Sequence, residues 1–331
     1  NNGSNAPKQG ANGQFQLPED KKWQWLPSAN LTYSPIQSLN IRAAYSGTVV
    51  RPEMMDNSQF FRYSAYLGGN YGSTGLYSTR IDSWDIKAEL FPGLGEIISA
   101  GAFYKNFDKP AEMAINGNGD YNLRNADWAK VYGLEFELRK NFGFIYDTEI
   151  LNNLAAYGNL TLQKSEVKGT FQITDPNDPA GGTILASMKQ NRSMYGQTPY
   201  LFNVGLQYTS ELFGINLAYN KTGLKTALIS EQKHLTQYEL PREQLDAQIS
   251  YRFMKKRLEV KLNAGNILNT ASEIYRNFGS YEPNPDYEFN GDISDTQRLK
   301  EGFTDKYDEG DLIMFKQHFG RTFSTSLTYN F

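Results

Sequence analysis

Few side chains in this sequence could act as nucleophiles or metal ligands. The 331 residues include no cysteine and only two histidines, His234 and His318. A cysteine nucleophile and a cysteine-ligated metal site are therefore excluded, and we interpret each histidine as an ordinary polar residue. The glycine-rich stretch Gly68–Gly75 is followed by neither a Lys-Ser/Thr pair nor a helical pattern, so it does not fit a phosphate-binding loop. The sequence predicts no enzyme and no cofactor.

The segment 271–311 is strongly acidic and is the one candidate for binding a cation. It holds eleven Asp and Glu residues against four Lys and Arg. Carboxylate oxygens suit Ca²⁺, so Asp305, Asp308 and Asp311 form a weak candidate calcium site. Their spacing matches no calcium-binding loop, and a solvated acidic loop is the interpretation that we favour.

Aromatic side chains gather around one arginine in the segment 51–79. Such rings could stack on sugars or on a metal chelate, whereas packing among the loops is the alternative that we slightly favour. The candidate ligand-binding residues are Phe60, Arg62, Tyr63, Tyr66 and Tyr71.

Charged and apolar residues alternate in many short stretches, which indicates β-strands. In 131–141, for example, Leu134, Phe136 and Leu138 alternate with charged residues. Because successive side chains of a strand point to opposite faces, each stretch has one apolar and one polar face. We expect the polar face to line a lumen and to contact water or another domain. The lining residues are Asp85, Lys87, Glu89, Glu135, Glu137, Arg139, Asp246 and Arg252.

The alternation predicts an all-β chain of eleven strands, at 23–34, 38–50, 80–91, 96–107, 130–141, 152–167, 197–209, 213–228, 240–254, 257–270 and 312–331. Most exceed the ~5–6 residues of an average soluble strand and reach the ~9–11 that a tilted strand needs to cross a bilayer. Their connections alternate in length, with long segments at 51–79, 108–129, 168–196 and 271–311. Short turns on one rim, long outer loops on the other and aromatic strand ends are typical of a transmembrane antiparallel β-barrel.

Eleven strands do not close a barrel of this kind. Bacterial single-chain barrels have an even number of strands, and each unpaired backbone group in lipid costs several kcal/mol. We therefore expect another polypeptide segment, covalent or cleaved, to pair with the first and the last strand. In this interpretation residues 1–22 are a polar extracellular loop segment, and residues 23–331 form the C-terminal half of the barrel.

Seven short stretches together resemble one protein family. They are Leu26–Ser28, Ser46–Glu53, Ala102–Lys105, Val131–Glu135, Gly196–Tyr200, Pro241–Arg242 and the terminal Tyr329–Phe331. In their order and spacing the chain resembles the C-terminal half of a TonB-dependent outer-membrane receptor of the Bacteroidetes type. The resemblance implies a barrel of 22 strands, of which this chain supplies the last eleven, and an N-terminal plug domain that is not in this chain.

The same resemblance implies the barrel portion of an energy-coupled importer of a scarce nutrient in the cell outer membrane. Its implied partners are the rest of the barrel, the plug, the TonB complex and outer-membrane lipid, with a surface lipoprotein as a further candidate. A net charge of −3 gives no reason to expect nucleic acid. Chelated iron, glycan and peptide stay open as substrates. The alternatives are a passive porin or structural barrel subunit of an outer-membrane complex, and a soluble carbohydrate-binding β-sandwich.

Overall fold

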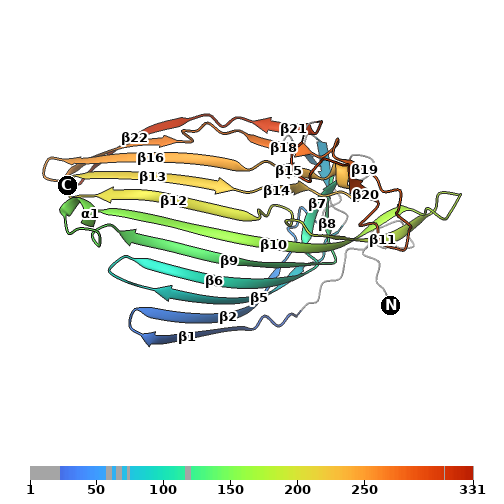
Figure 1. Ribbon diagram of the computed structural model, residues 1–331, viewed down its shortest axis with the longest axis horizontal. Coiled ribbons are helices and arrows are strands. Elements are labelled where there is room, and N and C mark those ends of the chain that lie inside the picture. Colours follow the sequence, from blue (N-terminus) through green and yellow to red (C-terminus); the bar gives the residue numbers. More distant parts are fainter. Residues whose placement is uncertain are drawn as a thin grey trace.

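One curved antiparallel sheet of eleven strands, in chain order, dominates the computed structural model (Figure 1). The structure describes residues 23–56, 62–64, 69–72, 75–115, 121–308 and 310–330. Residues 1–22, predicted as a loop segment, lie outside this range. The strands are β1 (Ser28–Ile36), β2 (Leu39–Val50), β5 (Thr79–Leu90), β6 (Ile97–Asp108), β9 (Trp128–Asn141), β10 (Leu154–Thr174), β12 (Tyr200–Thr209), β13 (Phe213–Thr222), β16 (Arg242–Phe253), β17 (Leu258–Gly265) and β22 (Thr322–Tyr329). The predicted all-β sheet of eleven strands is confirmed.

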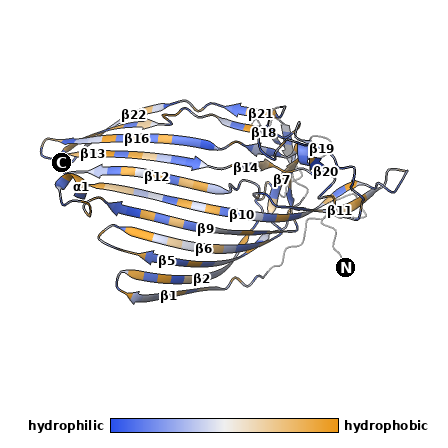
Figure 2. Ribbon diagram, in the orientation of Figure 1, coloured by the Kyte–Doolittle hydropathy of each residue, from blue (hydrophilic) through white to orange (hydrophobic). Residues whose placement is uncertain are grey.

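The strand register gives the sheet one continuous polar face. Lys87 pairs with Gly101, Gly101 with Glu135, and Glu135 with Thr161. Because paired residues share a face, following such pairs from strand to strand places all eight predicted lining residues on the same side of the sheet. Figure 2 shows the matching alternation of hydrophilic and hydrophobic residues along strands such as β10 and β16.

The opposite face of the sheet is apolar and uncovered. Leu134 is 46% exposed, Phe136 41% and Leu138 45%. Within the described part of the chain no second sheet packs against this face. The alternative of a two-sheet sandwich is therefore wrong, because a sandwich would bury these side chains. No helix among the described residues is long and apolar enough to cross a membrane.

Aromatic residues form a row across four neighbouring strands of the apolar face, near the long loops. Tyr45 pairs with Trp84, Trp84 with Tyr104, and Tyr104 with Tyr132. The ring centroids of Tyr45 and Trp84 are 5.3 Å apart, and those of Trp84 and Tyr104 are 5.6 Å apart. Rows of rings at this height are typical of the aromatic girdles of membrane barrels.

The connections sort by length as predicted (Figure 1). The five short ones, 37–38, 91–96, 142–153, 210–212 and 254–257, all lie at one end of the sheet, and 142–153 contains the short helix α1 (Glu149–Asn152). The turn 254–257 is tight, because Met254, Lys255 and Lys256 all have positive φ angles. The long connections gather at the other end.

These long connections fold into a lobe built from small sheets. One sheet contains β3 (Arg62–Ser64), β4 (Gly69–Gly72), β8 (Tyr121–Asn125) and β7 (Ala111–Ile115). A second contains β14 (Lys225–Leu228), β15 (Gln237–Glu239), β18 (Ser272–Arg276) and β21 (Leu312–Gln317). Strand β11 (Thr183–Gln190) pairs with the outer part of β10, and the lobe is completed by the pair β19 (Tyr281–Pro283) and β20 (Gln297–Leu299) and the 3₁₀ turn η1 (Lys233–Leu235).

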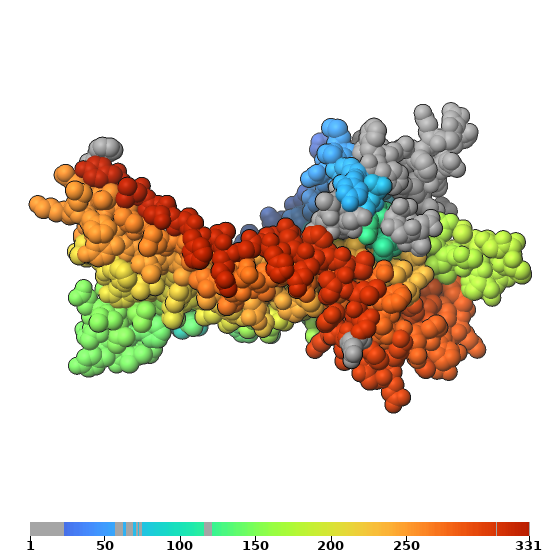
Figure 3. Space-filling model, turned by 90° about the horizontal axis from the view of Figure 1, so that it is seen from above, coloured from blue at the N-terminus to red at the C-terminus, as the bar shows by residue number. Residues whose placement is uncertain are grey.

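The hydrophobic core of the described residues lies mainly in this loop lobe, not in the large sheet. One cluster consists of Ala114, Phe171, Ala186, Met188, Ile229 and Ile293, and an adjoining one of Met113, Ile115, Tyr121 and Leu228. The Ile115 N–H donates to the Ile229 carbonyl at 2.8 Å, which ties the β7–β8 hairpin to the segment after β14. Figure 3 shows the lobe as the thicker end of the molecule.

The structure corrects three predicted strands at turns. The predicted strand 312–331 is two strands, because the chain turns at Gly320, whose φ is 74°. His318 lies in that break and not on a strand. The predicted strand 213–228 is divided into β13 and β14, and 257–270 ends at Gly265, because Asn266 and Asn269 have φ angles of 51° and 55°.

Candidate ligand-binding site

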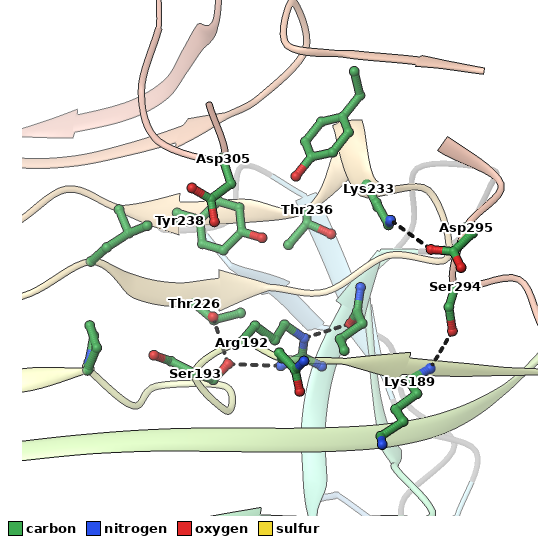
Figure 4. A pocket seen from close by; sticks show the side chains of 15 residues that line it. Lys189, Arg192, Ser193, Thr226, Lys233, Thr236, Tyr238, Ser294, Asp295 and Asp305 are labelled. Carbon is green, nitrogen blue, oxygen red and sulfur yellow. Dashed lines mark hydrogen bonds and ion pairs between the residues drawn. The ribbon is translucent and has the colours of Figure 1, made fainter. Parts of the chain in front are cut away.

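A polar cavity of about 340 Å³ lies inside the loop lobe, and we call it the loop pocket (Figure 4). This volume falls at the lower end of the ~300–1,000 Å³ of small-molecule sites. Three parts of the chain form its wall: residues 189–193 at the end of β11, residues of β14, η1 and β15, and residues of the acidic segment. The lining includes Lys189, Arg192, Ser193, Thr226, Lys233, Thr236, Tyr238, Tyr281, Ser294, Asp295 and Asp305.

A buried ion pair fixes Arg192 in the wall of the loop pocket. Its Nη1 and Nη2 donate to the two carboxylate oxygens of Glu112 at 2.8 and 2.7 Å, and the Tyr195 N–H donates to the same carboxylate at 2.9 Å. The Glu112 side chain is 1% exposed and that of Arg192 9%. Bidentate pairs of this kind are strong and directional, so the pair attaches the β7–β8 hairpin to the pocket wall.

The electrostatics of the pair follow from this burial. Burial raises the pKa of Glu112, but the attraction and hydrogen bonds of Arg192 and the Tyr195 amide outweigh it and hold the pKa below the ordinary glutamate value. Burial lowers the pKa of Arg192, and Glu112 more than compensates. Both groups are therefore ionised at neutral pH, and their charges cancel.

Arg192 uses four of its five N–H groups in hydrogen bonds to described residues. A guanidinium carries five N–H groups. Besides the two bonds to Glu112, Nε donates to Gln190 Oε1 at 2.7 Å and Nη1 to the Ser193 carbonyl at 3.0 Å. Among the described residues, one N–H of Nη2 thus has no acceptor.

The two lysines of the loop pocket also face carboxylates. Lys189 Nζ lies 2.5 Å from Glu166 Oε1. Lys233 Nζ lies 4.0 Å from Asp295 Oδ1 and donates to the Gln297 carbonyl at 3.1 Å. Burial lowers the pKa of Lys233, and Asp295 opposes that shift.

Hydroxyl groups complete the loop pocket. Thr236 is 1% exposed, and its Oγ1 has no hydrogen-bond partner among the described residues. Burial raises the phenol pKa of both Tyr238 and Tyr281, and although the Arg192 guanidinium lowers that of Tyr238 and Asp305 raises both, the net pKa of each phenol is above its ordinary value. Both phenols therefore stay protonated at neutral pH and can donate as well as accept hydrogen bonds.

The two histidines differ in their surroundings. His234 lies in η1, where its Nδ1 is 2.7 Å from Gln297 Nε2 and its ring packs edge-on against Phe278 at 5.9 Å. His318 is exposed. These contacts are those of ordinary polar side chains.

Of the predicted aromatic ligand set, the structure describes the side chains of Arg62 and Tyr63 only, and neither lines the loop pocket. Phe60 and Tyr66 lie outside the described residues, and only the backbone of Tyr71 is described, in β4. Tyr63 is 70% exposed, and Arg62 Nη2 lies 3.3 Å from Asp56 Oδ1. A ligand-binding role for this set stays a prediction.

The acidic segment uses two of its candidate calcium ligands for its own folding. Asp311 accepts hydrogen bonds from Ser280 Oγ at 3.1 Å and from the Asp308 N–H at 2.9 Å, and Asp308 accepts from the Thr304 N–H at 2.7 Å. Within the described residues no three His, Asp or Glu side chains are grouped to hold a metal ion. Only Asp305 of the three lines the loop pocket. The calcium site stays a prediction.

Sequence reasoning missed the other residues of the loop pocket. Arg192 and Glu112 are 80 positions apart, and no spacing or periodicity connects them. The stretch Gly196–Tyr200, one of those that resemble the family, is the closest indication in the sequence. It lies at the end of the β11–β12 connection, which also contains Arg192.

The fold and the loop lobe together define a class, the outer-membrane type of antiparallel barrel with large loops on one rim. The model of one family, described as TonB dependent receptor-like, beta-barrel, matches residues 2–267. The chain therefore belongs to this family of transport receptors, not of enzymes. No curated protein matches it.

Solved structures of one protein, PfeA, show the same fold. A mutant of the ferric enterobactin receptor PfeA from Pseudomonas aeruginosa, crystallised with enterobactin, is 16% identical with a TM-score of 0.52. The alignment covers 92% of this chain and 40% of that one. The siderophore receptor PirA from the same organism is 15% identical over 75% of this chain and 37% of its own, with a TM-score of 0.46. The chain thus spans about two fifths of these proteins.

Proposed function

We propose that this chain is the C-terminal half of the barrel of a TonB-dependent importer, of the Bacteroidetes type, in the cell outer membrane. Family membership supports an outer-membrane location. The observation that carries the proposal is the single sheet with one polar and one uncovered apolar face, in a chain of this family. In lipid, such a sheet forms a wall with a polar lumen.

The two open edges of the sheet support a larger assembly. Every residue of β1 and of β22 is exposed, and within the described part of the chain each of these two strands pairs on one side only. Unpaired backbone groups at both edges would cost several kcal/mol each in lipid. In our proposal, eleven further strands and a plug domain from outside this chain complete the barrel. This agrees with the alignment, in which the chain covers only 40% of PfeA.

The charged residues of the polar face favour contact with a plug domain or with water. Some charges of this face are paired, as in Arg42 with Glu89 at 2.6 Å and Lys87 with Glu137 at 3.3 Å, whereas Asp85 and Glu135 have no ion-pair partner among the described residues. Charged groups on such a face need water or the polar surface of a second domain around them, because burying them against apolar groups is costly.

Energy coupling distinguishes this proposal from a passive porin. The test uses cells that carry the full-length receptor and compares uptake of chelated iron, oligosaccharides and peptides with and without the receptor gene. One of these nutrients should require the receptor and also a functional TonB, and uptake should stop when an uncoupler collapses the proton gradient. Receptor-dependent uptake that persists without TonB would establish the passive porin instead.

A further inference from the structure

We propose that the loop pocket binds a neutral, hydroxyl-rich ligand, such as a sugar unit of an oligosaccharide. This inference rests on the proposed import function and names the substrate class. Among chelated iron, glycan and peptide, the charges and hydrogen-bonding groups of the loop pocket favour the glycan.

The charges of the loop pocket oppose an anionic ligand such as a ferric chelate. Each of its cations already faces a carboxylate: Arg192 pairs with Glu112, Lys189 with Glu166, and Lys233 lies near Asp295. Asp305 lines the pocket as well, and its carboxylate has no ion-pair partner among the described residues. An anion would therefore meet a carboxylate with no uncompensated cation to balance it.

The hydrogen-bonding groups of the loop pocket match hydroxyl groups instead. The unused N–H of Arg192 is a donor, and the Asp305 carboxylate is an acceptor. Thr236 Oγ1 is buried and has no partner among the described residues, although buried polar groups in native proteins almost always have one. A sugar hydroxyl both donates and accepts, so a row of hydroxyls can satisfy all three groups.

The surroundings of the loop pocket suit a chain of such units. Tyr238 (Figure 4) and Tyr281 contribute phenols to its wall, and aromatic side chains offer apolar faces for sugar rings. A second cavity of about 570 Å³ shares Asn191, Arg192, Ser193 and Pro199 with it, and its far side borders Tyr132 of the outward, apolar face. A ligand in the loop pocket therefore has room beside it next to these four shared residues.

The experiment measures binding to the full-length receptor in detergent by calorimetry. The probes are a panel of neutral oligosaccharides and, as the anionic probe, ferric tris-catecholate. At least one neutral oligosaccharide should bind, with an affinity insensitive to salt concentration, because no charge on the ligand is involved. Thr236→Val and Asp305→Ala should each weaken this binding about tenfold, the effect of losing one good hydrogen bond.

Asp286→Ala is the matched control, because Asp286 is an exposed carboxylate of the same segment that does not line the loop pocket. It should bind like the unmodified receptor. Thr236→Val removes a hydroxyl without a partner, so folding should be preserved, and unchanged resistance of the lobe to protease confirms this for each variant.

Three results would overturn the proposal: no binding of any neutral oligosaccharide, neutral binding that both variants leave unchanged, or binding of the ferric chelate that Asp305→Ala alters. Each is distinguishable from failure of the import function, because TonB-dependent uptake is measured separately. Uptake that needs TonB together with any of these results would leave the import function standing.

Discussion

Glu112 and Arg192 link two loops that are distant in sequence, and their burial makes the link strong only while both charges are present. Breaking such a pair on one side leaves the other charge buried without compensation, which costs about 3–5 kcal/mol. The stability of the loop lobe therefore depends on a contact that no sequence pattern indicates.

We predict that Glu112→Ala destabilises the loop lobe by about 3–5 kcal/mol. Hydrogen exchange of residues 111–125 and 189–195 in the full-length receptor measures this as a loss of amide protection. Glu282→Ala is the control, because Glu282 pairs with Arg298 at 2.9 Å on the surface, where such pairs contribute about 0–1 kcal/mol. Equal protection in the two variants would contradict a stabilising role for the buried pair.

The same pair predicts a dependence on pH. The folded lobe holds the pKa of Glu112 below its ordinary value, so the contribution to stability is present above that ordinary value, about 4.3. It is lost as the pH falls through the folded pKa. Amide exchange measured at pH 7 and at successively lower pH should show a loss of protection on acidification that Glu112→Gln largely removes. The same acid dependence in both proteins would show that other carboxylates cause it.

Residue types alone indicated one member of the loop pocket, Asp305, within an acidic segment. The other groups come from segments that the fold brings together, such as Arg192 from the β11–β12 connection and Thr236 from the β14–β15 connection. Their joint position depends on loop packing around Phe171 and Ile229, which leaves no periodic signal in the sequence. The loop pocket could therefore not be predicted from the sequence as a binding site.

The strands, in contrast, were predictable because alternation acts over adjacent residues. In β9 the period of two alone assigns Phe136 and Glu137 to opposite faces of the sheet. The register confirms this assignment, because Phe136 pairs with Leu160 and Glu135 pairs with Thr161. The errors fell at strand ends, as at Asn266 and Gly320, where positive φ angles turn the chain. A local pattern does not show whether an alternating stretch continues past such a turn.

Leu160 and Thr161 are adjacent in β10 but lie on opposite faces, which permits a paired test. Leu160→Arg should destabilise the full-length barrel by about 2–4 kcal/mol, because it puts a charge near the middle of the apolar face. Thr161→Arg should have a smaller effect, because its side chain lies with Glu135 on the polar face. Urea unfolding in lipid vesicles measures both. Similar losses of unfolding free energy would mean that the faces are assigned wrongly.

At the scale of the whole molecule, two parts are stabilised in different ways. The loop lobe has a hydrophobic core of its own, whereas the large sheet exposes its apolar side chains and both of its edges. The sheet therefore needs a surrounding that the described residues do not supply. Lipid against the apolar face and further strands at β1 and β22 meet both needs.

The most direct test of whether lipid covers the apolar face places spin labels along β9 in the full-length receptor, reconstituted in lipid vesicles. Residues 1–331 contain no cysteine, so once any cysteine elsewhere in the full-length receptor is replaced by serine, single cysteines at positions 134–139 carry the label alone. We predict that labels at 134, 136 and 138 are accessible to oxygen dissolved in the lipid, and that labels at 135, 137 and 139 are accessible to a water-soluble nickel chelate or covered by the plug. Labels at 134, 136 and 138 that neither reagent reaches, or that only the nickel chelate reaches, would contradict the account.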